Sequence, residues 1–260
     1  IPDRTYDFRA TYDGTTAEQS ITVAGTTTGT FYTTGVVVTV YNHNGTDGLN
    51  DVDIQYKAGW WRNFGTTHDG PGYDGKKGRQ LFPNPAPMKF KASFVGTFAT
   101  QDVTIAGDGA TSGNITDVTF YTSAVIVRVK KHNSDPLDDV DISYQAGWWR
   151  SMGPTHSGGL NGHQFFPNPD PLKFKASFLG TSATQDVVIS GDGTASGNFQ
   201  YVDFYTSAMV IEVKGCDPSG SPVAGADVDY KAGWWRSVGS GSTNSSGLSG
   251  MNRFPGTYGF

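Results

Sequence analysis

The sequence predicts an all-β fold made of tandem antiparallel β-sandwich repeats, with about seven short strands in each repeat. Three observations predict it. The chain has 260 residues, of which 35 are glycines, and it is rich in Thr, Ser, Asp and Asn, which favour turns. Val, Thr, Tyr and Phe dominate the segments between those turns, and this is the composition of strands. Long phrases recur at a fixed spacing, and no segment has the apolar period of an amphipathic helix.

The repeat period is 84 to 89 residues, and it is read from phrases that recur almost unchanged. The phrase AGWWR places its first tryptophan at Trp60, Trp148 and Trp234, and the phrase KFKASF surrounds Phe90 and Phe174. This spacing is too long for one coil of a solenoid and matches the length of a small β-sandwich domain. We therefore expect each copy to fold as one sandwich.

The second copy shows the order of strands within one repeat. Its segments alternate apolar and polar residues, as in 140–144, which predicts strands with one solvated face. A proline-rich connector at 167–171 excludes both a helix and a regular β-ladder. Phe174 follows mid-strand on an apolar face, so we expect it and its counterpart Phe90 to be buried. The expected strands are 124–129, 140–144, one that starts at Trp148, 164–166, 172–178, 187–189 and 202–205.

Laid end to end, the copies predict two complete repeats and one that is divided between the ends of the chain. The complete repeats run over 35–122 and 123–206. Residues 207–260 repeat strands one to four and then stop. Strands five to seven of that copy match residues 1–34, where the fifth-strand phrase surrounds Phe8. The two end segments are therefore predicted to be complementary halves of one sandwich.

Neither half can close a sandwich alone. Each would leave an apolar face and unpaired strand edges in water, which marks a site of association or aggregation. We therefore expect residues 1–34 to act as a donor piece and residues 207–260 as an acceptor piece. The expected donor contacts are Tyr6, Phe8, Ala10, Tyr12, Ile21, Val23 and Phe31, and the expected acceptor contacts are Val210, Val228, Trp234, Phe254, Tyr258 and Phe260.

The third copy carries the motifs of a known kind of domain. Residues 217–228 contain the phrase PVAGA before a strand, a Gly-Trp pair follows at Gly233, and Pro255 opens the phrase PGTY. This pattern resembles the prealbumin-like, or carboxypeptidase-regulatory-like, β-sandwich repeats of microbial surface proteins. The first two copies depart from it, because they lack the Gly-Ala pair. The resemblance implies a stalk, an adhesin module or a fibre subunit that is extracellular or at the cell surface.

Composition and motifs argue against several classes of function. The net charge is −5 without a basic cluster, whereas phosphate binding needs concentrated Lys and Arg, so we expect no nucleic-acid partner. No run of roughly 18 or more apolar residues is present to span a membrane. The single cysteine, Cys216, excludes an intrachain disulfide framework. Strand Asp residues could offer oxygens to calcium, but a solvated strand face is the favoured interpretation. With no catalytic constellation, we expect no enzyme activity, no cofactor and no metal site.

The repeated tryptophan pairs are the strongest chemical feature. Adjacent residues of a strand face opposite sides, so we expect one tryptophan of each pair in the core and the other exposed beside an arginine. The exposed ring would pack between domains or stack on carbohydrate, and domain packing is the favoured interpretation. Three Asn-x-Ser/Thr sequons are candidate glycosylation sites. The residues concerned are Trp60, Trp61, Trp148, Trp149, Trp234 and Trp235, and Asn44, Asn114 and Asn244.

Three hypotheses describe the whole chain. The first is a structural subunit of an extracellular filament, a homopolymer whose chains join head to tail by completing the split sandwich. The second is a surface adhesin or carbohydrate-binding stalk, with the chain a fragment of a longer tandem array. The third is a closed monomer in which residues 1–34 fold back onto residues 207–260. The complementarity of the two end segments favours the first hypothesis.

Overall fold

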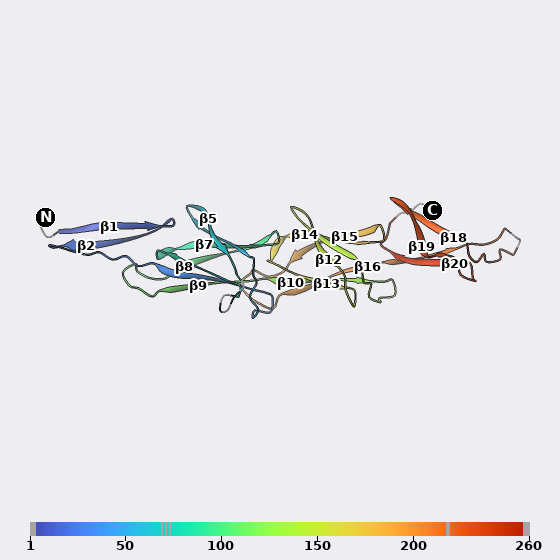
Figure 1. The fold of residues 1–260 in the computed structure, drawn as a ribbon, viewed down its shortest axis with the longest axis horizontal. Helices are drawn as coiled ribbons and strands as arrows, with labels where there is room; N and C mark the ends of the chain where they lie inside the picture. The colour runs from blue at the N-terminus through green and yellow to red at the C-terminus, as the bar shows by residue number, and fades with distance from the viewer. Residues whose placement is uncertain (1–3, 69, 71, 73, 217–218, 257–260) are drawn as a thin grey trace. The chain divides into compact units, whose positions relative to one another are not determined.

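The computed structural model describes residues 4–68, 70, 72, 74–216 and 219–256 (Figure 1). These residues form 20 strands, β1 to β20, and contain no helix. In this described part of the chain, therefore, no helix is long and apolar enough to cross a membrane. The strands lie in sheets of two to four. The predicted fold class, an all-β chain of β-sandwich repeats, is confirmed.

The chain divides into two compact units, and the first comprises residues 1–124, 164–170 and 188–199. Its sandwich has a three-stranded sheet in the order β6-β3-β9 and a four-stranded sheet in the order β5-β4-β7-β8. A two-stranded hairpin, β1-β2, precedes them in the chain. The bounds are β1 Arg4–Tyr12, β2 Thr15–Val23, β3 Thr34–Tyr41, β4 Asp53–Ala58, β5 Trp60–Thr66, β6 Lys76–Leu81, β7 Asn84–Phe94, β8 Thr97–Ile105 and β9 Ile115–Tyr121.

The second unit comprises residues 125–163, 171–187 and 200–260. It contains most of the sheets β13-β10-β16 and β12-β11-β14-β15, and two sheets of only two strands, β17-β20 and β18-β19. These two units do not coincide with the four segments expected from the repeat, so that fourfold division stays a prediction. The bounds are β10 Ser123–Lys130, β11 Asp141–Ala146, β12 Trp148–Pro154, β13 Leu160–Phe165, β14 Asn168–Phe178, β15 Thr181–Ile189, β16 Phe199–Tyr205, β17 Ser207–Glu212, β18 Asp227–Ala232, β19 Trp234–Ser242 and β20 Leu248–Arg253.

The core of the first sandwich is formed by apolar residues from both of its sheets. Val36 and Val38 on β3 are fully buried, and so are Tyr56 on β4 and Phe90 on β7. Strand alternation produces this layer, because every second side chain points to the same face. Burial of each such valine or phenylalanine contributes about 1.5–3 kcal/mol. Phe174 on β14 is also fully buried, so both predicted core positions are confirmed.

The proline-rich connectors differ from the prediction. We expected them to exclude a regular ladder, yet β7 and β14 include them. The pairing of β7 with β8 passes directly from Asn84–Ile105 to Met88–Val103, so Pro85 and Pro87 fall in an irregular part of the register. The fixed φ angle of proline suits extended chain, and the register shift removes the need for the missing N–H.

The inner strands of the first sandwich are each paired on both sides. β3 pairs antiparallel with β6 and parallel with β9, where Val38 lies opposite Val118. β4 pairs antiparallel with β5 and with β7, where Tyr56 lies opposite Phe90. Each inner strand of this sandwich therefore has both of its edges hydrogen-bonded.

Candidate assembly interface

The N-terminal hairpin exposes the apolar face that its counterpart in the first sandwich buries. β1 pairs with β2 from Arg4–Val23 to Tyr12–Thr15, and no other described strand pairs with it. The side chains of Tyr6, Phe8 and Tyr12 are 37, 42 and 51% exposed. Phe90, which the repeat aligns with Phe8, is 0% exposed. The hairpin therefore has the side-chain pattern of a core strand without a second sheet to cover it.

A hollow borders the same apolar face. Its volume is about 210 Å³. In a complete sandwich, side chains of the facing sheet fill such a space. Four expected donor residues are brought together here, whereas Thr27 and Gly29 were not expected. The lining residues are Phe8, Ile21, Val23, Thr27, Gly29 and Phe31.

Residues 207–260, here called the C-terminal half-domain, show fewer strand pairings than their counterpart in the first sandwich. Among the described strands, β18 pairs only with β19, and β17 pairs only with β20. Their counterparts in the first sandwich, β4 and β3, are each flanked on both sides. The additional neighbours of β4 and β3 are β7 and β9, which the repeat aligns with residues 1–34. Edge strands of this kind present unpaired N–H and C=O groups to an incoming strand.

The apolar core of this half-domain is small. Its buried members are Val228, Tyr230 and Val238, and Ile211 is among the residues that pack partly buried against them. Val228 was an expected acceptor contact. Tyr230 takes the place of Tyr56 in the repeat, so it marks the position where a fifth strand would be received.

Val210, another expected acceptor, lies on the wrong face of β17. It is 63% exposed, whereas its neighbours Met209 and Ile211 are partly buried. The alignment of 207–214 with 34–41 contained the signal, because it sets Met209 on Val36 and Ile211 on Val38. Sequence reasoning missed these two inner-face residues by a shift of one position, which exchanges the faces of a strand.

The remaining expected acceptors have other locations. Phe254 is fully buried, but against Phe204, with the ring centroids 6.2 Å apart. Trp234 is 66% exposed. Tyr258 and Phe260 lie outside the residues that the structure describes.

A second set of contacts, here called the hairpin joint, links each hairpin to the repeat that follows it. In each joint, a threonine just after the hairpin turn is buried and accepts a hydrogen bond at Oγ1 from the backbone N–H of a phenylalanine. The joint occurs at β1-β2, β7-β8 and β14-β15, so the N-terminal hairpin docks as the internal hairpins do. The bonds are Phe82 to Thr15 at 2.8 Å, Phe166 to Thr97 at 2.9 Å and Phe254 to Thr181 at 3.3 Å.

A buried tyrosine of the repeat that follows the hairpin adds a hydrogen bond to the hairpin joint. The Tyr56 hydroxyl donates to the Asp13 carbonyl at 2.7 Å, and the Tyr230 hydroxyl donates to the Leu179 carbonyl at 2.6 Å. Burial raises the pKa of Tyr56 to about 12, which keeps its phenol protonated as a donor. Beside it, Gly14 has φ +80°, and a Cβ there would overlap the guanidinium of Arg62. The positive φ angle therefore favours glycine at this turn, and a side chain there would also require the Arg62 guanidinium to move.

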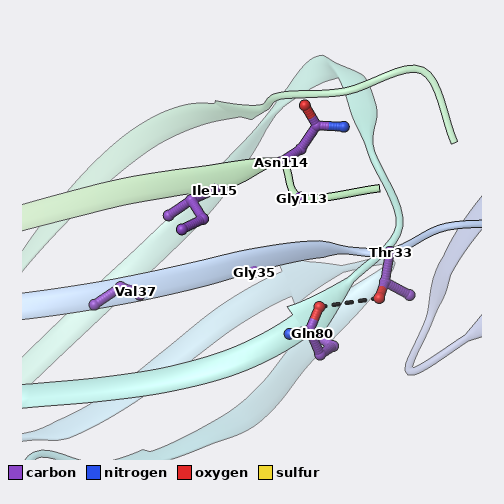
Figure 2. Close-up of a pocket in the computed structure, with 7 residues that line it drawn as sticks. All are labelled: Thr33, Gly35, Val37, Gln80, Gly113, Asn114 and Ile115. Atoms are coloured by element: carbon purple, nitrogen blue, oxygen red, sulfur yellow. Dashed lines mark hydrogen bonds between the residues drawn. The ribbon is translucent and has the colours of Figure 1, made fainter. Parts of the chain in front are cut away.

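Each repeat also carries the phrase FYT, which begins at Phe31, Phe120 and Phe204, and the threonine that ends it adds a further contact to the joint. Figure 2 shows the first example, in which Thr33 Oγ1 donates to Gln80 Oε1 at 2.9 Å. These residues border a pocket of about 350 Å³ that also includes Asn114 and Ile115. The counterparts of this bond are Thr122 to Gln164 at 2.8 Å and Thr206 to Asn252 at 3.5 Å.

Two Gly-Asp-Gly loops, at residues 107–109 and 191–193, take part in the joint, a role that their sequence did not reveal. Gly109 has φ +74°, and a Cβ there would lie 3.2 Å from the Ala17 side chain. The Gly109 carbonyl accepts a hydrogen bond from Gln19 Nε2 at 2.6 Å. Hydrogen bonds from the backbone N–H groups of Ala110 and Thr111 lower the pKa of Asp108. These contacts hold the loop against the β1-β2 hairpin.

The tryptophan prediction is wrong, because neither member of a pair is in the core. Trp60 is 66% exposed and Trp61 is 39% exposed. Alternation holds, but both rings lie at the turn of the β4-β5 hairpin, past the buried Tyr56. The Arg62 guanidinium carbon lies 4.4 Å from the Trp60 ring centroid, and Lys91 Nζ lies 5.0 Å from that of Trp61. The other pairs repeat this exposure: Trp148 66%, Trp149 40%, Trp234 66% and Trp235 57%.

Other candidate sites remain separate from the interface. Among the described residues, no group of His, Cys, Asp and Glu is arranged to hold a metal ion. Cys216 is exposed. The sequon residues Asn44 and Asn244 are exposed in loops, whereas Asn114 is partly buried before β9. Glycosylation at these sequons stays a prediction.

Comparison with known proteins found no matching family model and no match among curated proteins. Among solved structures, the Bacillus anthracis TIE protein is 11% identical with a TM-score of 0.27, and the match covers 94% of this chain and 47% of that one. The chain thus spans about half of that protein's length. A streptococcal ancillary pilin is 11% identical with a TM-score of 0.29, covering 87% of this chain and 88% of the pilin. The minor pilin GBS52 of Streptococcus agalactiae is 10% identical with a TM-score of 0.34, covering 67% and 95%. At these values the similarities carry no argument about function.

Proposed function

We propose that this chain is a non-enzymatic structural subunit of an extracellular or cell-surface filament. Its chains join head to tail when residues 1–34 of one copy complete the half-domain 207–260 of the next. The observation that supports this most directly is the exposed apolar face of β1. Tyr6, Phe8 and Tyr12 alternate there like the core residues of β7, but no described strand covers them.

The pairing of the complete repeats gives the register of the proposed contact. In the second repeat, β11 pairs antiparallel with β14, and Tyr144 lies opposite Phe174. The repeat aligns β18 with β11 and β1 with β14. Tyr230 of one copy would therefore lie opposite Phe8 of the other, and Val228 opposite Ala10. Each inward side chain of the donor then meets a buried or partly buried apolar residue of the acceptor.

The proposed contact leads to an open polymer. Donor and acceptor surfaces differ, so every chain keeps one free donor and one free acceptor unless the assembly closes into a ring. A hairpin and a third strand inserted into a half-domain would bury more than ~2,000 Å² in total, which is above a standard interface. Such a contact would resist dissociation much as a domain core resists unfolding.

The test is a charged substitution on the donor face. Phe8→Asp should leave the free chain folded, because this side chain is already 42% exposed, but it should abolish filaments by burying an unpaired carboxylate in the contact. The matched control is Phe98→Asp, on an exposed aromatic of β8 that the contact does not use. Electron microscopy and analytical ultracentrifugation give the readout, and circular dichroism checks folding.

A peptide of residues 1–34 provides a second arm. It should occupy free acceptors and shorten the filaments of the native chain. If the Phe8→Asp chain itself forms filaments of native length, strand complementation is excluded. Monomers of the native chain at all concentrations would exclude it as well, and would leave the closed monomer or the stalk.

The exposure of the tryptophans supports a second candidate, a carbohydrate-binding surface protein. Each first tryptophan has a cation over one ring face, as Arg62 has over Trp60, so the opposite face is the one offered to a sugar ring. A glycan array tests this directly. Binding that is lost in Trp60→Ala, Trp148→Ala and Trp234→Ala together would favour the adhesin, and no binding to any polysaccharide would remove it.

A further inference from the structure

The outward faces of the two chain ends carry charges in a complementary order. On β1, Asp7 and Arg9 are exposed and occupy the alternate positions between the apolar residues. On β18, Asp229 and Lys231 are likewise exposed. With Tyr230 opposite Phe8, the register places Asp229 opposite Arg9 and Lys231 opposite Asp7. Both cross-strand pairs then join opposite charges, which stabilises antiparallel pairing.

The complete repeats show no such pairs at the equivalent positions. In the first repeat, Gln55 lies opposite Lys91. In the second, Ser143 lies opposite Lys175 and Gln145 opposite Lys173. The two opposite-charge pairs at the chain ends are therefore not a general property of this strand pair, although single cations recur in it. Lys57 stands at the position of Lys231, and Lys91 and Lys175 stand at that of Arg9. The opposite-charge pairs occur only where two halves that are separate in the chain would meet.

We propose that Asp7, Arg9, Asp229 and Lys231 form a charge code that makes the acceptor of one copy select the N-terminal hairpin of a second copy in a single register. This inference rests on the proposed function and names the residues that give its contact specificity. A split interface needs such a code, because every chain also contains internal hairpins of the same shape.

The code discriminates against those internal hairpins. Lys173 on β14 occupies the position of Asp7, so an exchanged internal hairpin would set Lys173 opposite Lys231. Lys89 on β7 would do the same. Like charges directly opposite each other destabilise a strand pair. An acceptor that captured an internal hairpin of another copy would therefore lose one attractive pair and gain a repulsive one.

The code also fixes the register. A slip by one residue turns the apolar face outward, but a slip by two residues preserves it. In one such slip, Lys231 would lie opposite Arg9. In the other, Asp229 would lie opposite Asp7, while Asp227 would lie opposite Arg9. Each two-residue slip thus brings like charges together, and only the register of the complete repeats brings opposite charges together at both positions.

The donor charges are held in place across the hairpin before any contact. Arg9 lies opposite Glu18 on β2, with Nε 2.7 Å from Oε1. Asp7 lies opposite Ser20 and accepts its hydroxyl hydrogen bond at 2.6 Å. Docking would extend these into the rows Glu18–Arg9–Asp229 and Ser20–Asp7–Lys231. Because all the groups are exposed, salt should screen the selection.

The experiment exchanges one charge pair. Asp7→Lys and Lys231→Asp are made singly and together in the full chain, and end-to-end association is measured by ultracentrifugation at low and high salt. Each single variant should associate about threefold to tenfold more weakly than the native chain, a modest free-energy difference. The double variant should recover to within about twofold. Lys57→Asp is the matched control, since it makes the same charge change at the position in the first repeat that corresponds to Lys231.

Mixing provides the specificity readout. When labelled double variant and native chain are mixed at low salt, contacts between chains of the same kind should outnumber mixed contacts by about threefold to tenfold, because each mixed contact brings like charges together. At high salt this preference should disappear. Single variants that assemble like the native chain, or a double variant as weak as the two single losses combined, would overturn the charge code while leaving strand complementation intact. A native chain that never associates end to end would instead overturn the proposed function on which the code rests.

Discussion

At the scale of single residues, a few side chains decide how each hairpin joint is closed. A threonine hydroxyl, a tyrosine hydroxyl and a glycine with positive φ each contribute to the joint. Thr15 is buried and accepts from a backbone N–H. Tyr56 is buried and donates to a backbone carbonyl. Buried polar groups of this kind are favourable only while their partners stay in place, so the joint is specific to one geometry.

The raised pKa of Tyr56 leads to a prediction about alkaline pH. In the unfolded chain this phenol ionises near its ordinary pKa of about 10, and in the folded chain its pKa is about 12. The stabilising contribution is therefore fully present below pH ~10 and is lost as the pH rises to about 12. Tyr56→Phe should be less stable at pH 7 by about 0.5–1.5 kcal/mol, because it loses one hydrogen bond.

Urea unfolding at a series of pH values checks this. The stability difference between the native chain and Tyr56→Phe should shrink, and then reverse, between pH 10 and pH 12. A difference that stays constant over that range would show that the phenol does not ionise with unfolding. Tyr41→Phe is the control, because it removes a phenol at the partly buried end of β3, where the ring stacks on Tyr121 rather than in the joint.

At the scale of elements, equivalent strands have different energetic roles at different places in the chain. β14 and β1 carry the same fifth-strand phrase, but β14 is covered by a second sheet and β1 is not. Phe174→Ala should cost about 3–5 kcal/mol of the stability of the isolated chain, because it leaves a cavity in a closed core. Phe8→Ala should cost far less in the isolated chain, since its side chain is 42% exposed.

Denaturation of the monomeric chain measures the contrast, with assembly as the second readout. The small cost of Phe8→Ala in the monomer should be accompanied by a marked loss of end-to-end association. Equal costs for both substitutions in the monomer would mean that β1 is already covered, as in the closed monomer.

The elements also show how much the sequence alone could predict. Alternation and the repeat were sufficient to place Phe90 and Phe174 in the core and to identify β1 as an uncovered strand. They were insufficient at hairpin turns, where Trp60 and Trp61 alternate correctly but project past the core. They also gave Val210 the wrong face, because β17 is apolar on both faces and only its alignment with β3 resolves them. The joint was missed, since its threonines and glycines look like ordinary turn residues.

At the scale of the whole molecule, the half-domain at the C-terminal end should be the least stable part of the chain on its own. Among its described residues, the core cluster has Val228, Tyr230 and Val238 as its buried apolar members, while Phe254 is buried against Phe204 instead. Small cores provide little net stability. Completion by a second copy acts as binding to the folded state, which raises stability with concentration.

We therefore predict that unfolding of this part depends on protein concentration. Hydrogen exchange should show weak protection of β17 and β18 in dilute chain and strong protection in assembled chain, while β10 and β11 change little. Addition of the 1–34 peptide should protect β17 and β18 in dilute chain as well. Equal protection at all concentrations would contradict completion between chains.

The parallel pairing of β3 with β9 has a mechanical consequence for such a filament. The chain enters the first sandwich at the start of β3 and leaves it at the end of β9, and in a parallel pair these points lie at opposite ends. Traction along the chain would thus load the two strands in shear, with their hydrogen bonds sharing the force. In the completed half-domain, the complete repeats of the acceptor copy would pull on the start of β17. The complete repeats of the donor copy would pull on the end of the donor segment, just before Thr34. The non-covalent contact between two chains would then be loaded in shear, as a complete repeat is. Its lifetime under tension would be set by the unfolding rate of the completed domain, because the hydrogen bonds would have to break together and not one at a time.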